Sequence, residues 1–393
     1  MTFSKRTDWP KVLNLFSRKA EECRRSGQTP LDLTESNPTR CAFDYLKPKI
    51  LEGFSNPQSL LYEPDPRGLL AAREAVCRYY AEKGIRIGPD QVFLTASTSE
   101  AYTYLFRLLC NPGEPALAPA PSYPLFRYLS ELNDIELCEY RLRYNGEAWR
   151  VDIPHLERSF KNKTKAVILV NPNNPTGNFI HAHEREAVLS LCRKEEAAVI
   201  CDEVFHDFAF HSTEEPSIGF AGEERVLSFT LSGVSKIVGL PQAKLSWIVV
   251  NGPKALREEA ARRLEVLADT YLSVNTPSQR ALAGWLERRK EIQGEILERL
   301  RTNRRFLSER LEGVEAVRLL GSEGGWYAVL EVKSPCDDEA LAIRLLEKRQ
   351  VLVHPGYLFD FEGGCFLVLS LLPPSEVFRE GVERMVWELM DTP

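Results

Sequence analysis

Six short apolar runs alternate with stretches of helical periodicity, and this alternation limits the possible folds more than any other feature. The runs lie near residues 92, 117, 166, 197, 226 and 245, and each has the length and residue types of a strand. Strands that alternate with helices are typical of a doubly wound, mostly parallel α/β sheet. Because ligands of such sheets bind beyond the carboxyl ends of the strands, we expect a site in the loops that follow these runs.

Length and composition exclude several classes of protein. At 393 residues the chain exceeds the usual single-core size, so two domains are expected. A net charge of -6, with both signs interspersed, argues against nucleic acid as a partner. No apolar run approaches the roughly 20 residues that span a bilayer, and the N-terminus lacks the pattern of a signal peptide. We therefore predict a cytoplasmic protein without a membrane partner.

The cysteines do not indicate a metal site or a disulfide framework. The chain has nine of them, with no CxxC pair and no clustering with histidine. This usage fits reduced thiols that serve mostly as small core residues. We therefore predict no bound metal.

A lysine follows the fifth apolar run, in the turn that ends with Ser235-Lys236. A lysine amine beside apolar walls loses its proton more easily and can condense with an aldehyde to form a Schiff base. A single lysine in a turn is more often an ordinary solvated side chain. Two upstream stretches change this balance, because one run breaks into Asn174-Pro175-Thr176-Gly177 and the next ends in Asp202-Glu203.

With these three motifs in this order and approximate spacing, the sequence resembles the class I/II aminotransferases, which are fold-type I enzymes that use pyridoxal 5'-phosphate (PLP). The similarity extends over nearly the whole chain. It implies a large PLP-binding domain (46–303) with the mostly parallel doubly wound sheet and a smaller α+β domain (304–393). An N-terminal segment (1–45) would contribute to the small domain.

The resemblance also implies roles for four residues around the cofactor ring. Lys236 would carry the PLP aldehyde and then act as the base that moves the substrate's α-proton. Asp202 would face the ring nitrogen and keep it protonated, and Asn174 would donate to the phenolic oxygen. Tyr123 lies in a proline-flanked turn, where its ring can stack on the cofactor. Taken singly, Asp202 could cap a helix and Asn174 could be a turn residue.

The cofactor phosphate is expected at the start of a helix. Ser97, Thr98 and Ser99 stand there, where unpaired backbone N–H groups and hydroxyls favour an anion. The same residues would also serve as plain helix caps, and the family often has glycine at Ser97. Ser235 and Lys244 are the other predicted contacts of the cofactor.

The family builds each site from two subunits, so the resemblance implies a homodimer. Residues 273–279 and Tyr62 would lie at the interface, with Tyr62 reaching the neighbouring subunit's phosphate. The alternative is that Tyr62 only packs its own loop.

Three positions depart from the family pattern. Phe205 replaces a usual tyrosine and removes a hydroxyl partner of the phenolic oxygen. Lys244 replaces a usual arginine and so lacks the bidentate fork. Val368 stands where an arginine commonly holds the substrate carboxylate. Either another cation makes that contact or the substrate lacks a carboxylate there.

Candidates for that missing cation come from the expected mouth of the site. Asn37 and Arg40 lie where the family's chain passes this mouth, and Arg40 is the first candidate. Arg67 and Arg127 are expected in nearby loops. For each of these arginines an ordinary surface residue is the more frequent case.

The leading prediction is a PLP-dependent aminotransferase that moves an amino group between an amino acid or amine and a 2-oxo acid by a ping-pong mechanism. The first alternative is a PLP-dependent C–S lyase or a decarboxylase-like enzyme. The second is a PLP-binding regulator with little turnover. Such a regulator would need an appended DNA-binding helix-turn-helix. Only about 30 residues precede the core of the resemblance, which is too few for this motif and a linker.

Overall fold

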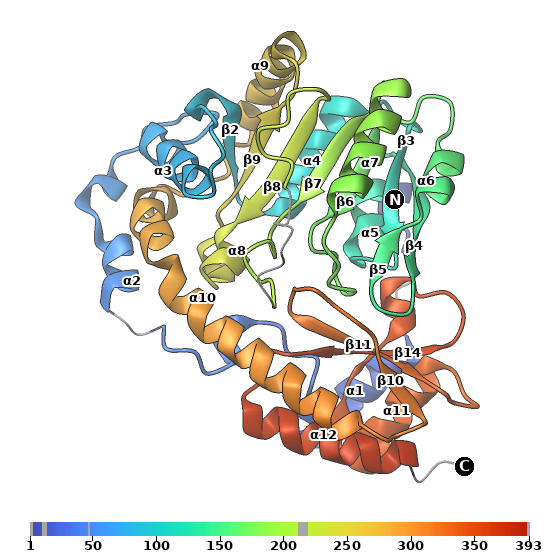
Figure 1. The fold of residues 1–393 in the computed structure, drawn as a ribbon. Helices are drawn as coiled ribbons and strands as arrows, with labels where there is room; N and C mark the ends of the chain where they lie inside the picture. Colours follow the sequence, from blue (N-terminus) through green and yellow to red (C-terminus); the bar gives the residue numbers. More distant parts are fainter. Residues whose placement is uncertain (1–2, 10–13, 46–47, 211–218, 391–393) are drawn as a thin grey trace.

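The computed structural model describes residues 3–9, 14–45, 48–210 and 219–390. A large α/β domain lies above a smaller α+β domain, and helix α10 (Thr276–Leu311) runs along both of them (Figure 1). The predicted α/β architecture, a mostly parallel sheet in a large domain with a second, smaller α+β domain, is confirmed.

The large domain is built on an eight-stranded sheet with the order β2-β9-β8-β7-β6-β3-β4-β5. Neighbours from β8 to β4 run parallel, whereas β9 is antiparallel to both its neighbours and β5 is antiparallel to β4. All six predicted runs are strands here, and their full burial explains why they read as continuous apolar segments. The strands are β2 (Val92–Thr95), β3 (Pro115–Ala120), β4 (Glu136–Tyr144), β5 (Trp149–Val151), β6 (Ala166–Val170), β7 (Ala198–Asp202), β8 (Ser228–Gly233) and β9 (Ser246–Asn251).

Helices cover both faces of this sheet and bury a separate core on each face. Side chains of α4, α5 and α9 form one core, and those of α3, α7 and α10 belong to the other. The bounds of these helices are α3 (Leu70–Ala81), α4 (Thr98–Leu109), α5 (Leu125–Leu132), α6 (Ile153–Ser159), α7 (Ala182–Lys194), α8 (Val234–Ile237) and α9 (Lys254–Tyr271), and α2 (Pro48–Glu52) precedes them.

The small domain combines the C-terminal part of the chain with its N-terminal segment. Its antiparallel sheet has the order β10-β11-β14-β13, and β1 (Leu31–Asp32) pairs in parallel with β12 (Val351–Leu352). The predicted boundary at residue 303 falls inside the continuous helix α10, so the domain limits stay a prediction. The other elements are α1 (Leu15–Arg25), β10 (Val317–Leu319), β11 (Tyr327–Val332), α11 (Asp338–Arg349), β13 (His354–Pro355), β14 (Cys365–Ser370) and α12 (Ser375–Met390).

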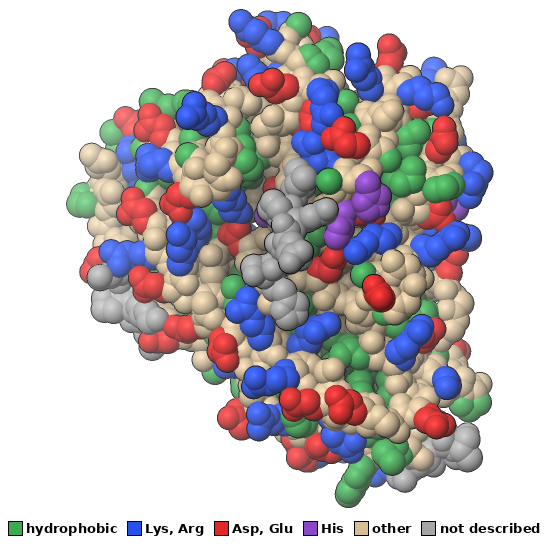
Figure 2. All heavy atoms as spheres, viewed as in Figure 1, with side chains coloured by type: hydrophobic (Ala, Val, Ile, Leu, Met, Phe, Trp, Pro, Cys, Tyr) green, Lys and Arg blue, Asp and Glu red, His purple; other side chains and the backbone are tan. Residues whose placement is uncertain are grey.

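The surface carries acidic and basic side chains interspersed over the visible face (Figure 2). Within the described ranges, none of the helices is both long enough and apolar enough to cross a membrane. The same residues contain no group of three or more His, Cys, Asp or Glu side chains that could hold a metal ion.

Candidate active site

The three motif residues meet at the carboxyl ends of neighbouring parallel strands. Asp202 ends β7, Asn174 follows β6, and Lys236 lies in α8 directly after β8. Val170 pairs with Asp202, and Asp202 pairs with Leu231, two residues before β8 ends, so the three strands end close together at one edge of the sheet. Together they enclose a cavity of about 210 Å³, which faces the small domain. The residues lining it are Ser36, Thr98, Tyr123, Phe126, Val170, Asn174, Asp202, Val204, Phe205, Ser235, Lys236, Ser246 and Tyr327.

Asp202 is a buried carboxylate with few donors. The residue is only 7% exposed. The backbone N–H of Val204 donates to one carboxylate oxygen at 3.1 Å, and the hydroxyl of Tyr102 donates to the other at 3.3 Å. Burial raises the pKa of Asp202 to about 6, although the two donors and Lys236 pull it down. The carboxylate therefore has spare capacity to accept a further charged donor.

Lys236 presents an amine that is easily deprotonated. Gly233 precedes α8, and a Cβ there would collide with Ser246, so this close passage needs glycine. The amine lies 4.6 Å from the ring centre of Trp326 and 5.3 Å from that of Phe205. Burial lowers the pKa of Lys236 to about 8, and the nearby Asp202 opposes this shift.

Asn174 and Tyr123 form the walls between these two charged groups. Asn174 is 8% exposed, and its buried Oδ1 has no hydrogen-bond partner. The preceding residue, Asn173, donates to Pro121 O at 3.0 Å and thereby ties the loops of Asn174 and Tyr123 together. The ring of Tyr123 packs edge-on against Phe126 at 5.8 Å between centres. An unsatisfied amide oxygen and an aromatic face therefore border the same space.

Hydroxyl groups gather at the end of the cavity where α4 begins. Thr98, Ser235 and Ser246 line it. Ser97 is the N-cap of α4, and its hydroxyl accepts the N–H of Glu100 at 3.1 Å, which is the capping alternative. Ser99 and the exposed Lys244 are not among the lining residues. Only part of the predicted phosphate set is thus brought together within this chain.

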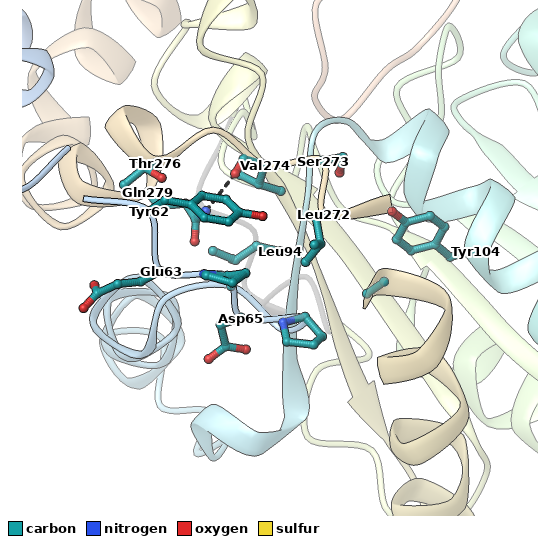
Figure 3. Close-up of a pocket in the computed structure, with 14 residues that line it drawn as sticks. Tyr62, Glu63, Asp65, Leu94, Tyr104, Leu272, Ser273, Val274, Thr276 and Gln279 are labelled. Carbon is teal, nitrogen blue, oxygen red and sulfur yellow. Dashed lines mark hydrogen bonds between the residues drawn. The ribbon is translucent and has the colours of Figure 1, made fainter. Parts of the chain in front are cut away.

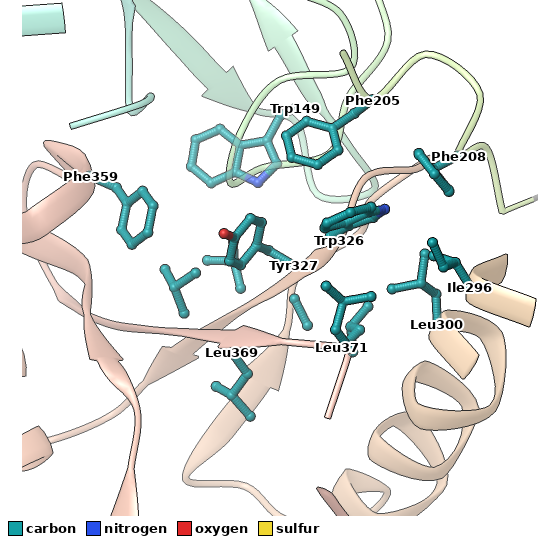
Figure 4. Packing of buried hydrophobic residues seen from close by; sticks show 14 of the residues in the cluster. Trp149, Phe205, Phe208, Ile296, Leu300, Trp326, Tyr327, Phe359, Leu369 and Leu371 are labelled. Atoms are coloured by element: carbon teal, nitrogen blue, oxygen red, sulfur yellow. The ribbon is translucent and has the colours of Figure 1, made fainter. Parts of the chain in front are cut away.

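The small domain supplies a wall that the sequence analysis did not identify. Tyr327 lines the cavity from β11, and Trp326 beside it packs on Phe205 at 5.3 Å and on Phe208 at 5.2 Å (Figure 4). These residues belong to the segment GGWYAVLEV, which reads only as a strand. The other lining residues missed are Ser36, Phe126, Val170, Val204 and Ser246.

A second hollow of about 430 Å³ opens beside the cavity and shares Ser36 and Lys236 with it. Both Asn37 and Arg40 line this hollow. Asn37 accepts the N–H of Thr39 at 3.1 Å, and Arg40 lies 3.8 Å from Glu35 with its side chain 74% exposed. Arg40 is therefore only loosely paired and stands next to the cavity.

The other two arginines do not stand at this mouth. Arg67 is paired with Glu265 at 2.5 Å, and Arg127 is in helix α5, paired with Glu131 at 3.0 Å. The expectation of a loop is wrong for Arg127, which lies in helix α5, whereas Arg67 does lie in a turn before α3. Neither arginine lines the cavity or the adjoining hollow. Val368 is fully buried in β14, where it pairs with Val329 and His354.

Tyr62 lies away from the cavity, in a separate surface pocket. It is 74% exposed and shares this pocket with Ser273, Val274, Thr276 and Gln279 (Figure 3). The tyrosine and the segment predicted to accompany it at an interface therefore lie side by side.

Comparisons with known proteins agree with this geometry. The family model for aminotransferase class I and II matches residues 30–377. An alanine aminotransferase of Mycobacterium tuberculosis is 28% identical, covering 93% of this chain and 87% of its own length. A glutamate-pyruvate aminotransferase of Escherichia coli is 24% identical, covering 88% and 86%. The solved structure of an alanine aminotransferase from Pyrococcus furiosus has a TM-score of 0.91 and 25% identity, covering 99% of this chain and 100% of that one.

Proposed function

Because the chain belongs to the class I and II aminotransferase family, we propose that Lys236, Asp202 and Asn174 hold its PLP cofactor and carry out amino-group transfer. The predicted family, PLP dependence and transfer between an amino compound and a 2-oxo acid are confirmed. The comparisons do not favour the C–S lyase alternative. The roles of individual residues are the proposal.

One observation carries these roles. Asp202 and Lys236 line one cavity, and burial moves the pKa of both groups toward neutrality, raising that of Asp202 to about 6 and lowering that of Lys236 to about 8. The side chain of Asn174 lines the same cavity, and its amide group can supply a donor there. A protonated pyridine ring with a phenolic oxygen, an aldehyde and a phosphate suits this set, so the residues fit PLP.

PLP, when bound, supplies the electron sink for negative charge that develops at the substrate's Cα. The carboxylate of Asp202 would keep the ring nitrogen protonated through a charge-assisted hydrogen bond. The amide of Asn174 would donate to the phenolic oxygen, and the ring of Tyr123 would stack on the cofactor. The neutral amine of Lys236 would bind the aldehyde. Later it would remove the proton from the substrate's Cα and deliver it to the cofactor.

The phosphate would lie at the start of α4. Thr98 and Ser235 are proposed as direct hydroxyl donors, since both line the cavity there. Ser97 and Ser99 would contribute through the unpaired N–H groups of the first helical turn. Lys244, whose side chain is exposed, would add a positive charge from outside the cavity.

For substrates we propose a neutral amino acid with alanine as the reference donor, and pyruvate as an acceptor. The name of the Mycobacterium tuberculosis relative supports alanine, and that of the Escherichia coli relative supports pyruvate. Within the described part of the chain, Lys236 and Asp202 are the only charged residues that line the cavity. Arg40 and Asn37, in the adjoining hollow, are therefore proposed to bind the substrate carboxylate.

The proposed transfer is tested with the purified holoenzyme and L-alanine in the absence of a 2-oxo acid. We expect one equivalent of pyruvate per site, conversion of the cofactor to its amino form, and no ammonia. Adding a second 2-oxo acid should restore the aldehyde form and complete a ping-pong cycle. Continuous release of ammonia would support elimination, and no response to any α-amino acid would refute the proposal.

The proposed carboxylate contact is tested by Arg40→Ala. Loss of a charged partner should raise KM for both L-alanine and pyruvate by about ten- to a hundredfold, with a smaller change in kcat. Arg127→Ala is the matched control, because Arg127 is equally exposed but pairs with Glu131 on α5. An unchanged KM in Arg40→Ala would remove Arg40 from the site.

We further propose a homodimer that works in the cytoplasm. Apolar side chains gather around Tyr62, with Leu60 93%, Leu61 56% and Leu272 42% exposed, and such a patch is typical of an interface. Nine unpaired cysteines support a reducing compartment. Tyr62 would then reach the partner's phosphate. Sedimentation should give a dimer, Leu60→Asp should weaken it, and a fully active monomer would contradict this assembly.

A further inference from the structure

The buried hydroxyl of Tyr102 contacts the carboxylate at the centre of the site. Tyr102 is 1% exposed, and its hydroxyl lies 3.3 Å from Asp202 Oδ2. It stands one turn into α4, four residues after Thr98, so both side chains project from the same face of the helix. A single helix therefore brings Thr98 to one end of the cavity and Tyr102 to the carboxylate.

Aromatic packing fixes the position of this hydroxyl. The ring of Tyr102 meets Phe126 edge-on at 5.2 Å and lies 5.9 Å from Phe106. Phe126 in turn packs against Tyr123, the proposed stacking residue. Burial, reinforced by the charge of Asp202, raises the pKa of Tyr102 well above its ordinary value, so the phenol remains a donor at any working pH.

We propose that Tyr102 is a positioning residue, whose hydroxyl orients the Asp202 carboxylate and keeps it ionised so that the cofactor's ring nitrogen retains its proton. The inference rests on the proposed function, in which Asp202 faces that nitrogen. Tyr102 touches neither the substrate nor the cofactor in this role. It acts through Asp202 alone.

The physical argument concerns where one proton resides. A hydrogen bond to an ionised carboxylate stabilises the charged form, and among the described residues Asp202 has two such donors, Tyr102 and the backbone of Val204. The proton can lie on the ring nitrogen, which leaves Asp202 as a carboxylate, or on Asp202, which leaves the ring neutral. Without the hydroxyl of Tyr102, the first of these two states becomes less stable relative to the second. A ring nitrogen that is protonated less of the time is a weaker electron sink.

The other ionisable groups around Asp202 cannot replace the hydroxyl. Glu203 raises the pKa of Asp202 and so works against the hydroxyl. The charge of Asp202 helps to raise the pKa of Tyr123, but Tyr123 does not donate a hydrogen bond to Asp202. Lys236 lowers the pKa of Asp202 through its charge, but in the proposed holoenzyme its amine is bound to the cofactor. Tyr102 is thus the one side-chain donor to Asp202 that the described residues provide.

The test is Tyr102→Phe, which removes the hydroxyl and keeps the ring between Phe106 and Phe126. In the holoenzyme loaded with ¹⁵N-labelled PLP, the ring-nitrogen chemical shift should move toward the value of unprotonated pyridine. We expect kcat to fall about three- to tenfold, KM for L-alanine to stay within about twofold, and PLP to bind more weakly.

Tyr140→Phe is the matched control. Tyr140 is also 1% exposed, and its hydroxyl donates to Ile168 O at 2.8 Å on the sheet, away from Asp202. It should lower the melting temperature comparably and leave the nitrogen shift unchanged. An equal shift in both variants, or no shift in Tyr102→Phe, would overturn the inference.

Asp202→Asn separates this inference from the proposed function. If Asp202→Asn moves the nitrogen signal and Tyr102→Phe does not, only the role of Tyr102 fails. If Asp202→Asn leaves the signal in place, the assignment of Asp202 fails, and the role of Tyr102 fails with it.

Discussion

Two carboxylates five residues apart, Asp202 at the end of β7 and Asp207 in the turn that follows it, have opposite environments. Asp202 receives two weak donors and has its pKa raised to about 6 by burial. Asp207 pairs with Lys83 and accepts hydrogen bonds from Tyr79 at 3.1 Å and from Gln293 at 2.7 Å. Burial alone would raise the pKa of Asp207, but Lys83 reverses this and lowers it. A buried carboxylate can accept a hydrogen bond from a cofactor only where the protein has not already paired it with a cation and further donors.

The two lysines differ in the same way. Lys83 is held in an ion pair with Asp207, whereas Lys236 faces the rings of Phe205 and Trp326 and has its pKa lowered to about 8. The Asp207 cluster still supports the site, because Gln293 also donates to Ile237 O, next to Lys236. Through Gln293, the Asp207 cluster therefore holds in place the segment that carries Lys236.

The largest contrast should come from the two lysines. Lys236→Arg keeps a positive charge but cannot form the Schiff base, so kcat should fall by at least about a thousandfold and the yellow colour should be lost. Lys83→Met should leave kcat within about threefold and lower the melting temperature instead. Turnover assays and absorbance spectra of both variants decide this. A coloured, active Lys236→Arg protein would end the proposed mechanism.

Replacing the two carboxylates should change the free energy of unfolding of the apoprotein in opposite directions. The raised pKa of Asp202 means that the folded state binds its proton more tightly. This favours folding below about pH 4, and the gain is lost as pH rises through about 6. At pH 8, Asp202→Asn should therefore stabilise the apoprotein by about 2–3 kcal/mol.

Asp207→Asn should have the opposite effect. The lowered pKa of Asp207 means that its stabilising contribution is present at neutral pH and is lost in acid. Removing that charge leaves Lys83 without its partner and should cost about 2 kcal/mol at pH 8. Urea denaturation of the two apoproteins measures both effects. Equal destabilisation by both substitutions would show that Asp202 is a structural residue.

The sequence predicted the polar groups that follow the strands of the large sheet and missed the side chains that the small domain supplies. Asn174, Asp202 and Lys236 each end an apolar run, and parallel strands place such residues at one edge of the sheet. Tyr327 and Ser36 come from the small domain, whose docking on this edge leaves no local pattern. The fold class could be predicted because six strands show as apolar runs, whereas the antiparallel direction of β9 has no such signal.

Tyr102 illustrates a second limit of the sequence. Its spacing with Leu105 and Phe106 is that of an ordinary buried helix face, and all three residues are indeed buried. Only the three-dimensional structure shows that its hydroxyl meets Asp202, a hundred residues further along the chain. Arg67 and Arg127 pair with Glu265 and Glu131, and only the structure shows that neither lines the cavity or the adjoining hollow.

The smallest expected effect concerns how the apoprotein takes up PLP at different pH. Only the neutral amine of Lys236 reacts with the aldehyde, and its pKa is lowered to about 8. The rate should therefore rise about tenfold between pH 7 and 9 and level off above that. Asp202 is already ionised over this range, since its pKa is about 6, so the rise reports Lys236. Stopped-flow absorbance gives the profile, and Lys83→Met should reproduce it. A midpoint near the ordinary pKa of lysine would mean that burial in the cavity does not lower the pKa of Lys236.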